Sequence, residues 1–188
     1  AAGEVVERPA SIVKERVENA LDAGAGDIRI ELVRGGCESI RVTDNGSGIL
    51  RDDVALVFER HATSKISRID DLGRIASFGF RGEAMASIAS VARVDLLTRR
   101  PEDLAGTKAA VEAGFISEIA PAGLPPGTQI TVTKLFANVP ARRKFLKTEA
   151  TEESGEAGDE QLHVAQHLGS EDLAHGPGEE AQGGTEHA

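Results

Sequence analysis

The sequence of 188 residues contains no tryptophan, no tyrosine and only one cysteine, Cys37. A single thiol excludes an intramolecular disulfide bond, which favours a protein of the reducing cytoplasm. No apolar run approaches the roughly 18 residues that a membrane-spanning helix needs, and the N-terminus carries no signal-peptide pattern. We therefore expect a cytoplasmic protein without a membrane partner.

Basic residues are absent from the C-terminal part of the chain. Residues 151–188 contain ten Asp or Glu and no Lys or Arg, so this segment accounts for the whole net charge of −10. So few apolar side chains cannot offset the entropy of ordering, which predicts an acidic disordered tail, with at most a short helix around 160–168. Four of the five histidines lie in this tail without metal-ligand spacing, so no metal site is expected there.

Residues 1–150 show the periodicities of one folded domain. Apolar residues at helical spacing follow Pro9, which suits a first helical turn, and Gly24 and Gly26 end that helix. We expect helices near 9–23, 52–60, 83–90 and 140–147, strands near 27–33, 39–43, 91–98, 108–112 and 129–133, and a tight connection over 121–127. This order predicts the α+β class: a two-layer α/β sandwich with helices on one face of a mixed, mainly antiparallel sheet.

Glu15 and Asn19 lie four residues apart on the first predicted helix, so their side chains share a face. Such a pair alone is typical of any exposed helix surface. Because two glycine-rich turns follow it along the chain, we interpret the pair as functional. Glu15 can orient and deprotonate a water molecule, and Asn19 offers a neutral oxygen to Mg²⁺.

Asp44 ends a predicted strand and is followed by the glycine turn Asn45–Gly48. A hairpin turn would have the same composition. The functional interpretation is that Asp44 accepts a hydrogen bond from the exocyclic amine of adenine, while Gly46 and Gly48 allow the purine to approach the backbone. The glycines do not form the G-x-G-x-x-G pattern of dinucleotide-binding folds.

A second glycine-bounded loop, Gly79–Ala84, leads into a predicted helix. Backbone N–H groups at a helix N-terminus bind anions, and Arg81 can add positive charge. A plain helix entry is the alternative. No Gly-Lys-Ser or Gly-Lys-Thr occurs in the sequence, which excludes a P-loop.

The order of these motifs resembles the GHKL ATPases, the group of gyrase, a heat-shock chaperone, histidine kinases and MutL. Within that group the chain is most similar to the bacterial MutL family of DNA mismatch repair proteins. The resemblance covers about residues 1–151, and its most specific segments are Ala1–Ser11, His61–Lys65 with Gly79–Ala84, and Asn138–Lys147.

The resemblance implies the GHKL (Bergerat) ATPase fold and hydrolysis of ATP to ADP and phosphate with Mg²⁺. It implies that Glu15 is the general base, that Asn19 binds the metal, and that Asp44 reads adenine with Gly46, Gly48 and Thr128. The segments over the phosphates would contain Thr63, Ser64 and Lys65, together with Gly79, Phe80, Arg81, Gly82, Glu83 and Ala84.

A basic cluster follows Pro140 and contains Arg142, Arg143, Lys144 and Lys147. A solvated helix face is the simplest explanation of such a run. The resemblance implies nonspecific contacts to DNA phosphates, weak here because the acidic tail competes for the cluster. It also implies a MutS-like mismatch recognition protein as a partner.

The sequence departs from the family at both ends. The family's short segment ahead of Ala1 and its second domain, which supplies a lysine to the γ-phosphate, are not found, and neither is the dimerisation domain. We therefore expect weak hydrolysis and a monomer rather than the family's homodimer. A frameshift or an incomplete assembly would explain a non-native tail. Two alternatives stay open: a nucleotide-binding remnant without turnover, and a histidine-kinase-like phosphotransfer module, against which the MutL-like segments argue.

Overall fold

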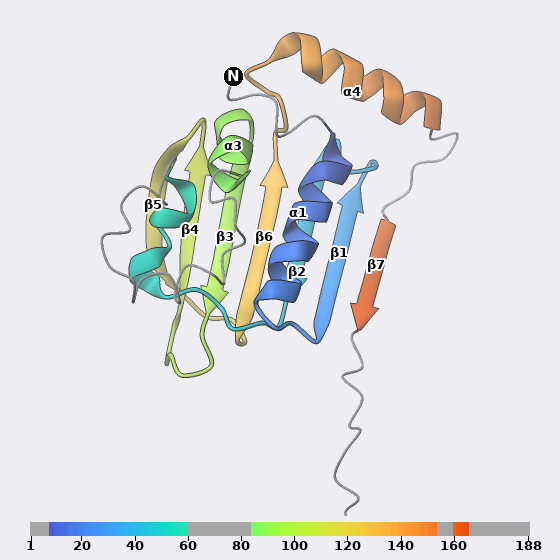
Figure 1. The fold of residues 1–188 in the computed structure, drawn as a ribbon. Helices are drawn as coiled ribbons and strands as arrows, with labels where there is room; N and C mark the ends of the chain where they lie inside the picture. Colours follow the sequence, from blue (N-terminus) through green and yellow to red (C-terminus); the bar gives the residue numbers. More distant parts are fainter. Residues whose placement is uncertain (1–7, 60–83, 154–159, 166–188) are drawn as a thin grey trace, which may run out of the picture.

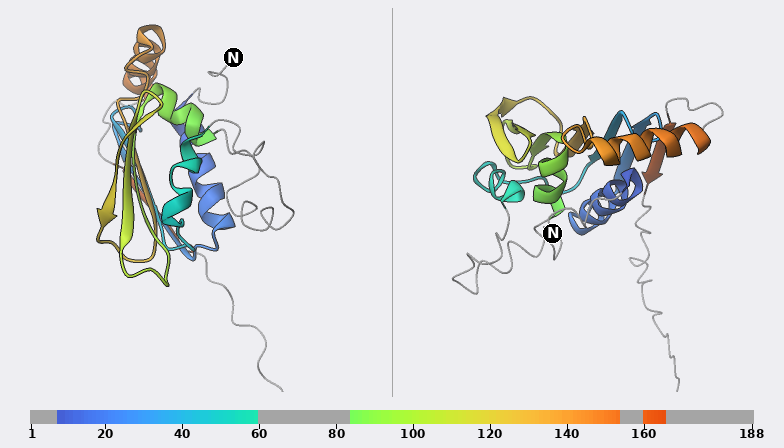
Figure 2. Two further views of the ribbon diagram at one scale, coloured as in Figure 1. Left: turned by 90° about the vertical axis from the view of Figure 1, so that its left-hand side faces the viewer. Right: turned by 90° about the horizontal axis from the view of Figure 1, so that it is seen from above.

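The computed structural model describes residues 8–59, 84–153 and 160–165. They form an antiparallel sheet of seven strands in the order β5-β4-β3-β6-β2-β1-β7, with α1 and α3 packed on one face (Figure 1, Figure 2). The elements are α1 (Pro9–Asp22), β1 (Asp27–Val33), β2 (Ser39–Asp44), the 3-10 helices η1 (Arg51–Asp53) and η2 (Leu56–Phe58), α3 (Ala84–Val91), β3 (Arg93–Arg99), β4 (Gly106–Glu112), β5 (Phe115–Ala122), β6 (Gly127–Thr133), α4 (Pro140–Glu153) and β7 (Glu160–Ala165).

The two-layer α+β architecture expected from the sequence is confirmed, and every pairing between the described strands is antiparallel. Strand β3 shows why the sheet has two different faces. Val94, Leu96 and Thr98 are buried under the helices, whereas Arg93 and Asp95 alternate with them on the open face and form an ion pair at 3.1 Å. The hydrophobic core therefore lies between the sheet and its single helical layer.

Helix α1 begins at Pro9, where the missing N–H of proline costs nothing, and ends before Gly24, which has a φ of +72°. Its inner face differs from the expected apolar stripe. Leu21, which we expected on the buried face, is exposed. Arg16 is buried instead, between Ile12 and Ala20. Residues four apart share a helix face, so Ile12, Arg16 and Ala20 point together toward the sheet.

Two strands were not predicted. Strand β5 includes Pro121, in the expected 121–127 connection, and is an edge strand with mostly exposed side chains, so it lacks the burial pattern of a strand. Strand β7 occupies residues 160–165, where we expected disorder or a short helix. It pairs in register with β1, whose edge supplies the hydrogen-bond partners that the isolated tail sequence does not have.

Two predicted helices differ in length or type. Where we expected one α-helix over 52–60, the described residues up to 59 form two 3-10 turns, η1 and η2. Helix α4 extends to Glu153 and stands at one end of the sheet, beyond the helical layer (Figure 1). It is attached through the buried Leu146, whose carbonyl accepts a hydrogen bond from the thiol of Cys37 at 3.6 Å.

Candidate functional site

The C-terminal end of α1 is joined to the glycine turn after β2 by a set of hydrogen bonds. The side-chain oxygen of Asn45 accepts hydrogen bonds from the backbone N–H groups of Gly26 and Asp27, both at 2.9 Å. The backbone N–H of Ser47 donates to the carbonyl of Ala23 at 2.9 Å. These bonds fix the position of α1, which carries Glu15 and Asn19, relative to the end of β2.

Asp44 is the last residue of β2 and pairs with Thr128 of β6. Its carboxylate accepts a hydrogen bond from the Gly46 N–H at 2.8 Å and another from the backbone of Thr128. Burial raises the pKa of Asp44, and these two amides, with the charge of Arg16, oppose that rise. The carboxylate is therefore a partly buried hydrogen-bond acceptor whose orientation is fixed by backbone N–H groups.

The glycines near Asp44 are required by backbone packing. A Cβ atom at Gly48, whose φ is +68°, would collide with the backbone of Arg99 at the end of β3. A Cβ atom at Gly127, with a φ of +127°, would collide with the carbonyl of Asp44. At Gly46 it would lie 2.9 Å from Ala23. These contacts give Gly46 and Gly48 a packing reason of their own, and their expected place beside a purine stays a prediction.

The side chain of Thr128 is buried against the neighbouring strand β3. Its hydroxyl lies 3.0 Å from the hydroxyl of Thr98, which also accepts a hydrogen bond from the Ile49 N–H at 2.8 Å. Both threonines are buried. Thr98 thus connects β3, β6 and the glycine turn, and sequence reasoning missed it because it lies inside a regular strand without a motif.

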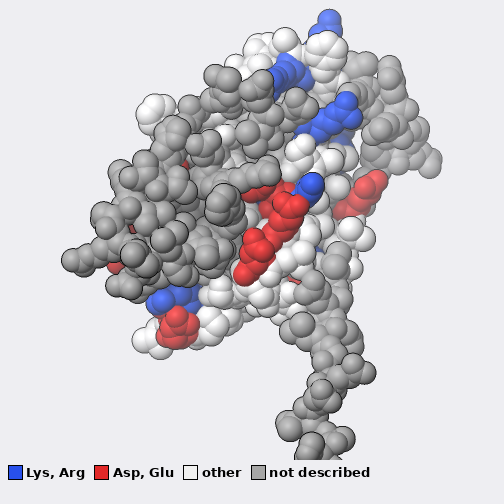
Figure 3. Space-filling view, in the orientation of Figure 1, with Lys and Arg blue, Asp and Glu red and all other residues white. Residues whose placement is uncertain are grey.

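Glu15 and Asn19 lie on α1 at the border between its buried face and solvent, and both side chains are partly exposed. Figure 3 shows acidic side chains gathered over the part of the surface that α1 forms. The described residues contain no group of three or more His, Cys, Asp or Glu that could hold a metal ion by itself. A metal at Asn19 would therefore need oxygen ligands from water or a substrate.

Arg16, next to Glu15 on α1, is a buried charged residue that the sequence analysis missed. Its side chain is 5% exposed, and its Nη2 lies 3.6 Å from Oε1 of Glu15. Burial lowers the pKa of Arg16 to about 10, against the opposing charges of Glu15 and Asp44. Its spacing from Ile12 and Ala20 was the available signal, because residues four apart on a helix share a face and these two apolar residues face the sheet.

Several predicted site residues lie outside the described part of the chain. Thr63, Ser64, Lys65 and the segment 79–83 belong to this group, and their positions stay predictions. Ala84 is described and is buried as the first residue of α3.

The basic cluster lies on α4. Arg143 and Lys144 are exposed, and the guanidinium of Arg142 lies 5.6 Å from the ring centre of Phe136. The side chain of Lys147 is outside the described set. Figure 3 shows basic side chains near this end of the molecule. The structure thus puts the basic cluster and the acidic surface of α1 on different elements.

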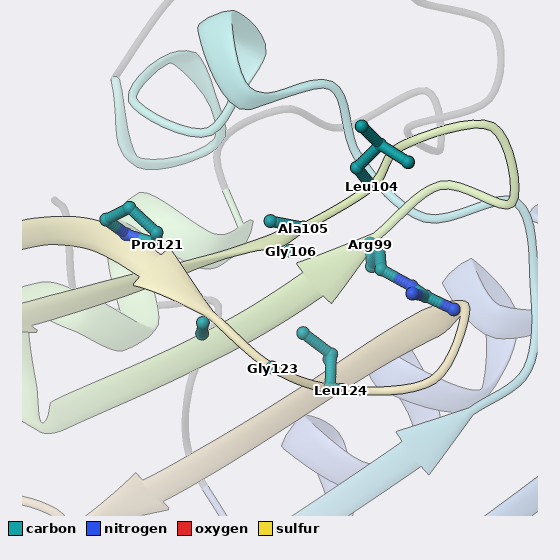
Figure 4. A pocket seen from close by; sticks show the side chains of 8 residues that line it. Arg99, Leu104, Ala105, Gly106, Pro121, Gly123 and Leu124 are labelled. Carbon is teal, nitrogen blue, oxygen red and sulfur yellow. The ribbon is translucent and has the colours of Figure 1, made fainter.

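A pocket of about 290 Å³ is lined by none of the predicted site residues, although its Arg99 lies next to Gly48 (Figure 4). It is formed where the β3–β4 connection meets the end of β5, and it is lined by Arg99, Leu104, Ala105, Gly106, Pro121, Ala122, Gly123 and Leu124. Arg99 is the one ionisable residue in this lining. This lining contains no acid–base pair. None of the described helices is long and apolar enough to cross a membrane.

Comparison with known proteins finds relatives that align with most of the chain. Residues 7–134 match the family described as histidine kinase-, DNA gyrase B-, and HSP90-like ATPase. The chain is 66% identical over 152 residues to the DNA mismatch repair protein MutL of Syntrophus aciditrophicus and 57% identical over 152 residues to that of Acidobacterium capsulatum. These alignments cover 81% of this chain but 25% and 23% of the relatives, so the chain spans about a quarter of their length.

Solved structures give the same picture. The Aquifex aeolicus MutL ATPase domain complexed with ADP is 38% identical with a TM-score of 0.60, and the match covers 79% of this chain and 51% of that one. The N-terminal domain of a DNA repair protein is 31% identical with a TM-score of 0.66, over 81% of this chain and 44% of that one.

Proposed function

The chain belongs to the family of histidine kinase-, DNA gyrase B- and HSP90-like ATPases, and we propose that it binds and hydrolyses ATP as part of a MutL-like DNA mismatch repair protein. The family resemblance inferred from the sequence is thereby confirmed. The more specific proposal is supported by the 66% identity to a MutL protein and by the likeness to a MutL ATPase domain that was solved with ADP.

The observation that carries the proposal is the environment of Asp44. A carboxylate fixed by the N–H groups of Gly46 and Thr128 has little freedom to turn toward water. Such an acceptor suits a planar ligand edge that presents an N–H donor, and the amine of adenine is one. We assign Asp44 to adenine recognition, with Gly46, Gly48 and Thr128 as the backbone around it.

Glu15 and Asn19 are assigned to the phosphate end of the site. Glu15 would accept a proton from the attacking water, and the partly exposed position of its side chain leaves it accessible. Asn19 would be an oxygen ligand of Mg²⁺, which fits a surface with no cage of three acidic ligands among the described residues. When bound, the metal would neutralise charge on the phosphates.

The remaining assignments are proposals from the resemblance. The segments Thr63–Lys65 and Gly79–Ala84 would cover the phosphates, and the basic cluster on α4 would contact DNA phosphates without sequence preference. A MutS-like protein would be the mismatch-recognising partner. Exposure of Arg143 and Lys144 supports the DNA assignment.

The experiment is a calorimetric titration of the 188-residue protein with ADP and with ATP, in the presence and absence of Mg²⁺. The variant Asp44→Asn replaces an acceptor oxygen by a donor amide, so it should weaken binding by about 10- to 100-fold, the effect of one buried unsatisfied group. Asp95→Asn is the matched control, because Asp95 lies on the open face of the sheet. Equal ADP affinity in Asp44→Asn and the parent protein would refute the site.

A further inference from the structure

The last carbonyls of α3 accept hydrogen bonds from segments that are distant along the chain. The carbonyl groups in the final turn of a helix have no donor within the helix. In α3 three of them, in succession, are bound at 2.7 to 2.8 Å by donors from outside the helix. The pairs, donor first, are the Gly114 N–H with Ala89, the side-chain amide of Asn138 with Ser90, and the Phe136 N–H with Val91.

Two of these donors belong to the connection between β6 and α4, residues 134–139, which we call the β6–α4 corner. Its backbone is strained, because Lys134 and Phe136 have φ values of +53° and +56°, where residues with a side chain are unfavourable. Phe136 is fully buried, and Nζ of Lys134 lies 2.7 Å from Oε1 of Glu112. A strained backbone persists only where its surroundings hold it. The β6–α4 corner is therefore held in one conformation.

Helix α3 depends on such external contacts for its position. It has eight residues, fewer than the roughly 12 to 15 that an isolated helix needs even for marginal stability. Half of its buried side chains are alanines, which bury little apolar area each. The hydrogen bonds at its C-terminal end therefore contribute strongly to fixing where it lies. The corner and α3 lie at the same end of the sheet (Figure 1).

The other end of α3 is the one that we assign to the nucleotide. Its first residue, Ala84, is the last residue of the segment Gly79–Ala84, which we assign to the phosphates. Backbone N–H groups at a helix N-terminus bind an anion when they point at it. A hydrogen bond weakens steeply when its distance and angle depart from the optimum, so a shift of the helix weakens this contact.

We propose that Asn138 is a positioning residue of the nucleotide site. By binding the carbonyl of Ser90 it fixes the C-terminal end of α3, and through this short helix it aims the N–H groups that receive the phosphates. The inference rests on the proposed function. Asn138 opens the segment Asn138–Lys147, in which the sequence analysis assigned a task to the basic cluster alone. Of the three donors it is the one that a substitution removes, because Gly114 and Phe136 donate through the backbone.

The test compares ADP with adenosine, which has no phosphates. Both ligands are titrated into the 188-residue protein with Mg²⁺ and followed by NMR chemical shifts. Asn138→Ala removes the donor and should weaken ADP binding by about 3- to 10-fold, the effect of one neutral hydrogen bond. Adenosine affinity should not change, because this ligand uses the Asp44 end of the site. Asn138→Gln keeps an amide donor and should retain most of the ADP affinity.

Asn138 is exposed, so its substitution leaves the core intact, and circular dichroism checks the fold of each variant. Ser117→Ala is the matched control. It also removes a bond from a side chain to a backbone carbonyl, the one from Oγ of Ser117 to Ala110 at 3.1 Å, but on β5 and away from α3. Neither affinity should change in this variant.

The role of Asn138 is refuted if Asn138→Ala leaves ADP affinity unchanged, or if it weakens ADP and adenosine equally. Equal weakening would show a general loosening of the fold rather than a displaced phosphate end. An ADP loss of the same size in Ser117→Ala would refute it as well. In each of these cases the parent protein binds both ligands, and the proposed function stands. If the parent protein bound neither ADP nor adenosine, the proposed function would fail, and this inference with it.

Discussion

Replacement of the buried Arg16 by methionine should make the fold more stable. The pKa of Arg16 falls well below its ordinary value, to about 10, in the folded protein, mainly because burial removes water from the guanidinium. Each pKa unit corresponds to about 1.4 kcal/mol, so keeping this cation charged costs the folded state about 3 kcal/mol. Methionine fills a similar volume without a charge and removes that cost.

Part of the gain is lost again, because Asp44 then has no cation to oppose its burial. We therefore expect a net rise of about 2 kcal/mol in the free energy of unfolding, which corresponds to roughly 4–8 °C in Tm for a chain of this size. Arg16→Lys keeps a buried cation and should show no comparable gain. Arg16→Ala leaves a cavity and should be less stable than Arg16→Met.

The pH dependence of the free energy of unfolding gives a further check on whether Arg16→Met stabilises the protein. The folded pKa of Arg16 lies below the unfolded one, so the free-energy cost of keeping this side chain charged is complete below about pH 10 and disappears as the pH rises to the unfolded pKa. The full cost is therefore present at pH 6 to 9, and Arg16→Met should show a constant gain in that range. Urea unfolding at pH 7 and pH 9 measures it. A lower unfolding midpoint in Arg16→Met than in the parent protein would refute the argument.

Three other variants test the remaining parts of the structure. Glu15→Gln should keep ATP binding and lower hydrolysis by about 10²- to 10⁴-fold, as expected for a lost general base; an equal loss of binding would make Glu15 structural. Asn45→Ala leaves the N–H groups of Gly26 and Asp27 without their acceptor and should lower the free energy of unfolding by about 1–3 kcal/mol, measured by urea denaturation. Deletion of residues 166–188, which keeps β7, should strengthen DNA binding at low salt; unchanged affinity in a filter assay would contradict competition by the acidic tail.

The parts of the fold that the sequence predicted are those with a strong periodic signal. Helix α1 and the β1–β2 hairpin have apolar residues at regular spacing and end at glycines, and both were located within one or two residues. Asp44 was identified as a candidate because it precedes a glycine turn. Its environment was not predictable, since the opposing amide of Thr128 comes from a strand more than 80 residues away.

The missed features share a physical reason: their role depends on contacts between distant segments. Strand β5 is exposed on both faces, so its side chains carry no burial alternation. Asn45 looks like a turn residue, yet its side chain fastens the end of α1. Arg16 interrupts an apolar stripe, and a polar residue at such a position is normally assigned to the surface. The segments predicted to lie over the phosphates were found from motifs, and except for Ala84 they lie outside the described residues.

The pairing of β7 with β1 should give the backbone hydrogen bonds on the two sides of β1 different lifetimes. On one side β1 pairs with β2, which lies in the interior of the sheet. On its other side β1 pairs with the edge strand β7. The side chains of His163 on β7 and Asp27 on β1 are 2.8 Å apart. A terminal strand held mainly by backbone bonds detaches without the sheet unfolding. In hydrogen–deuterium exchange, the amides of β1 that point to β7 should therefore exchange early and those that point to β2 late, so alternate residues of one strand would report two separate opening events.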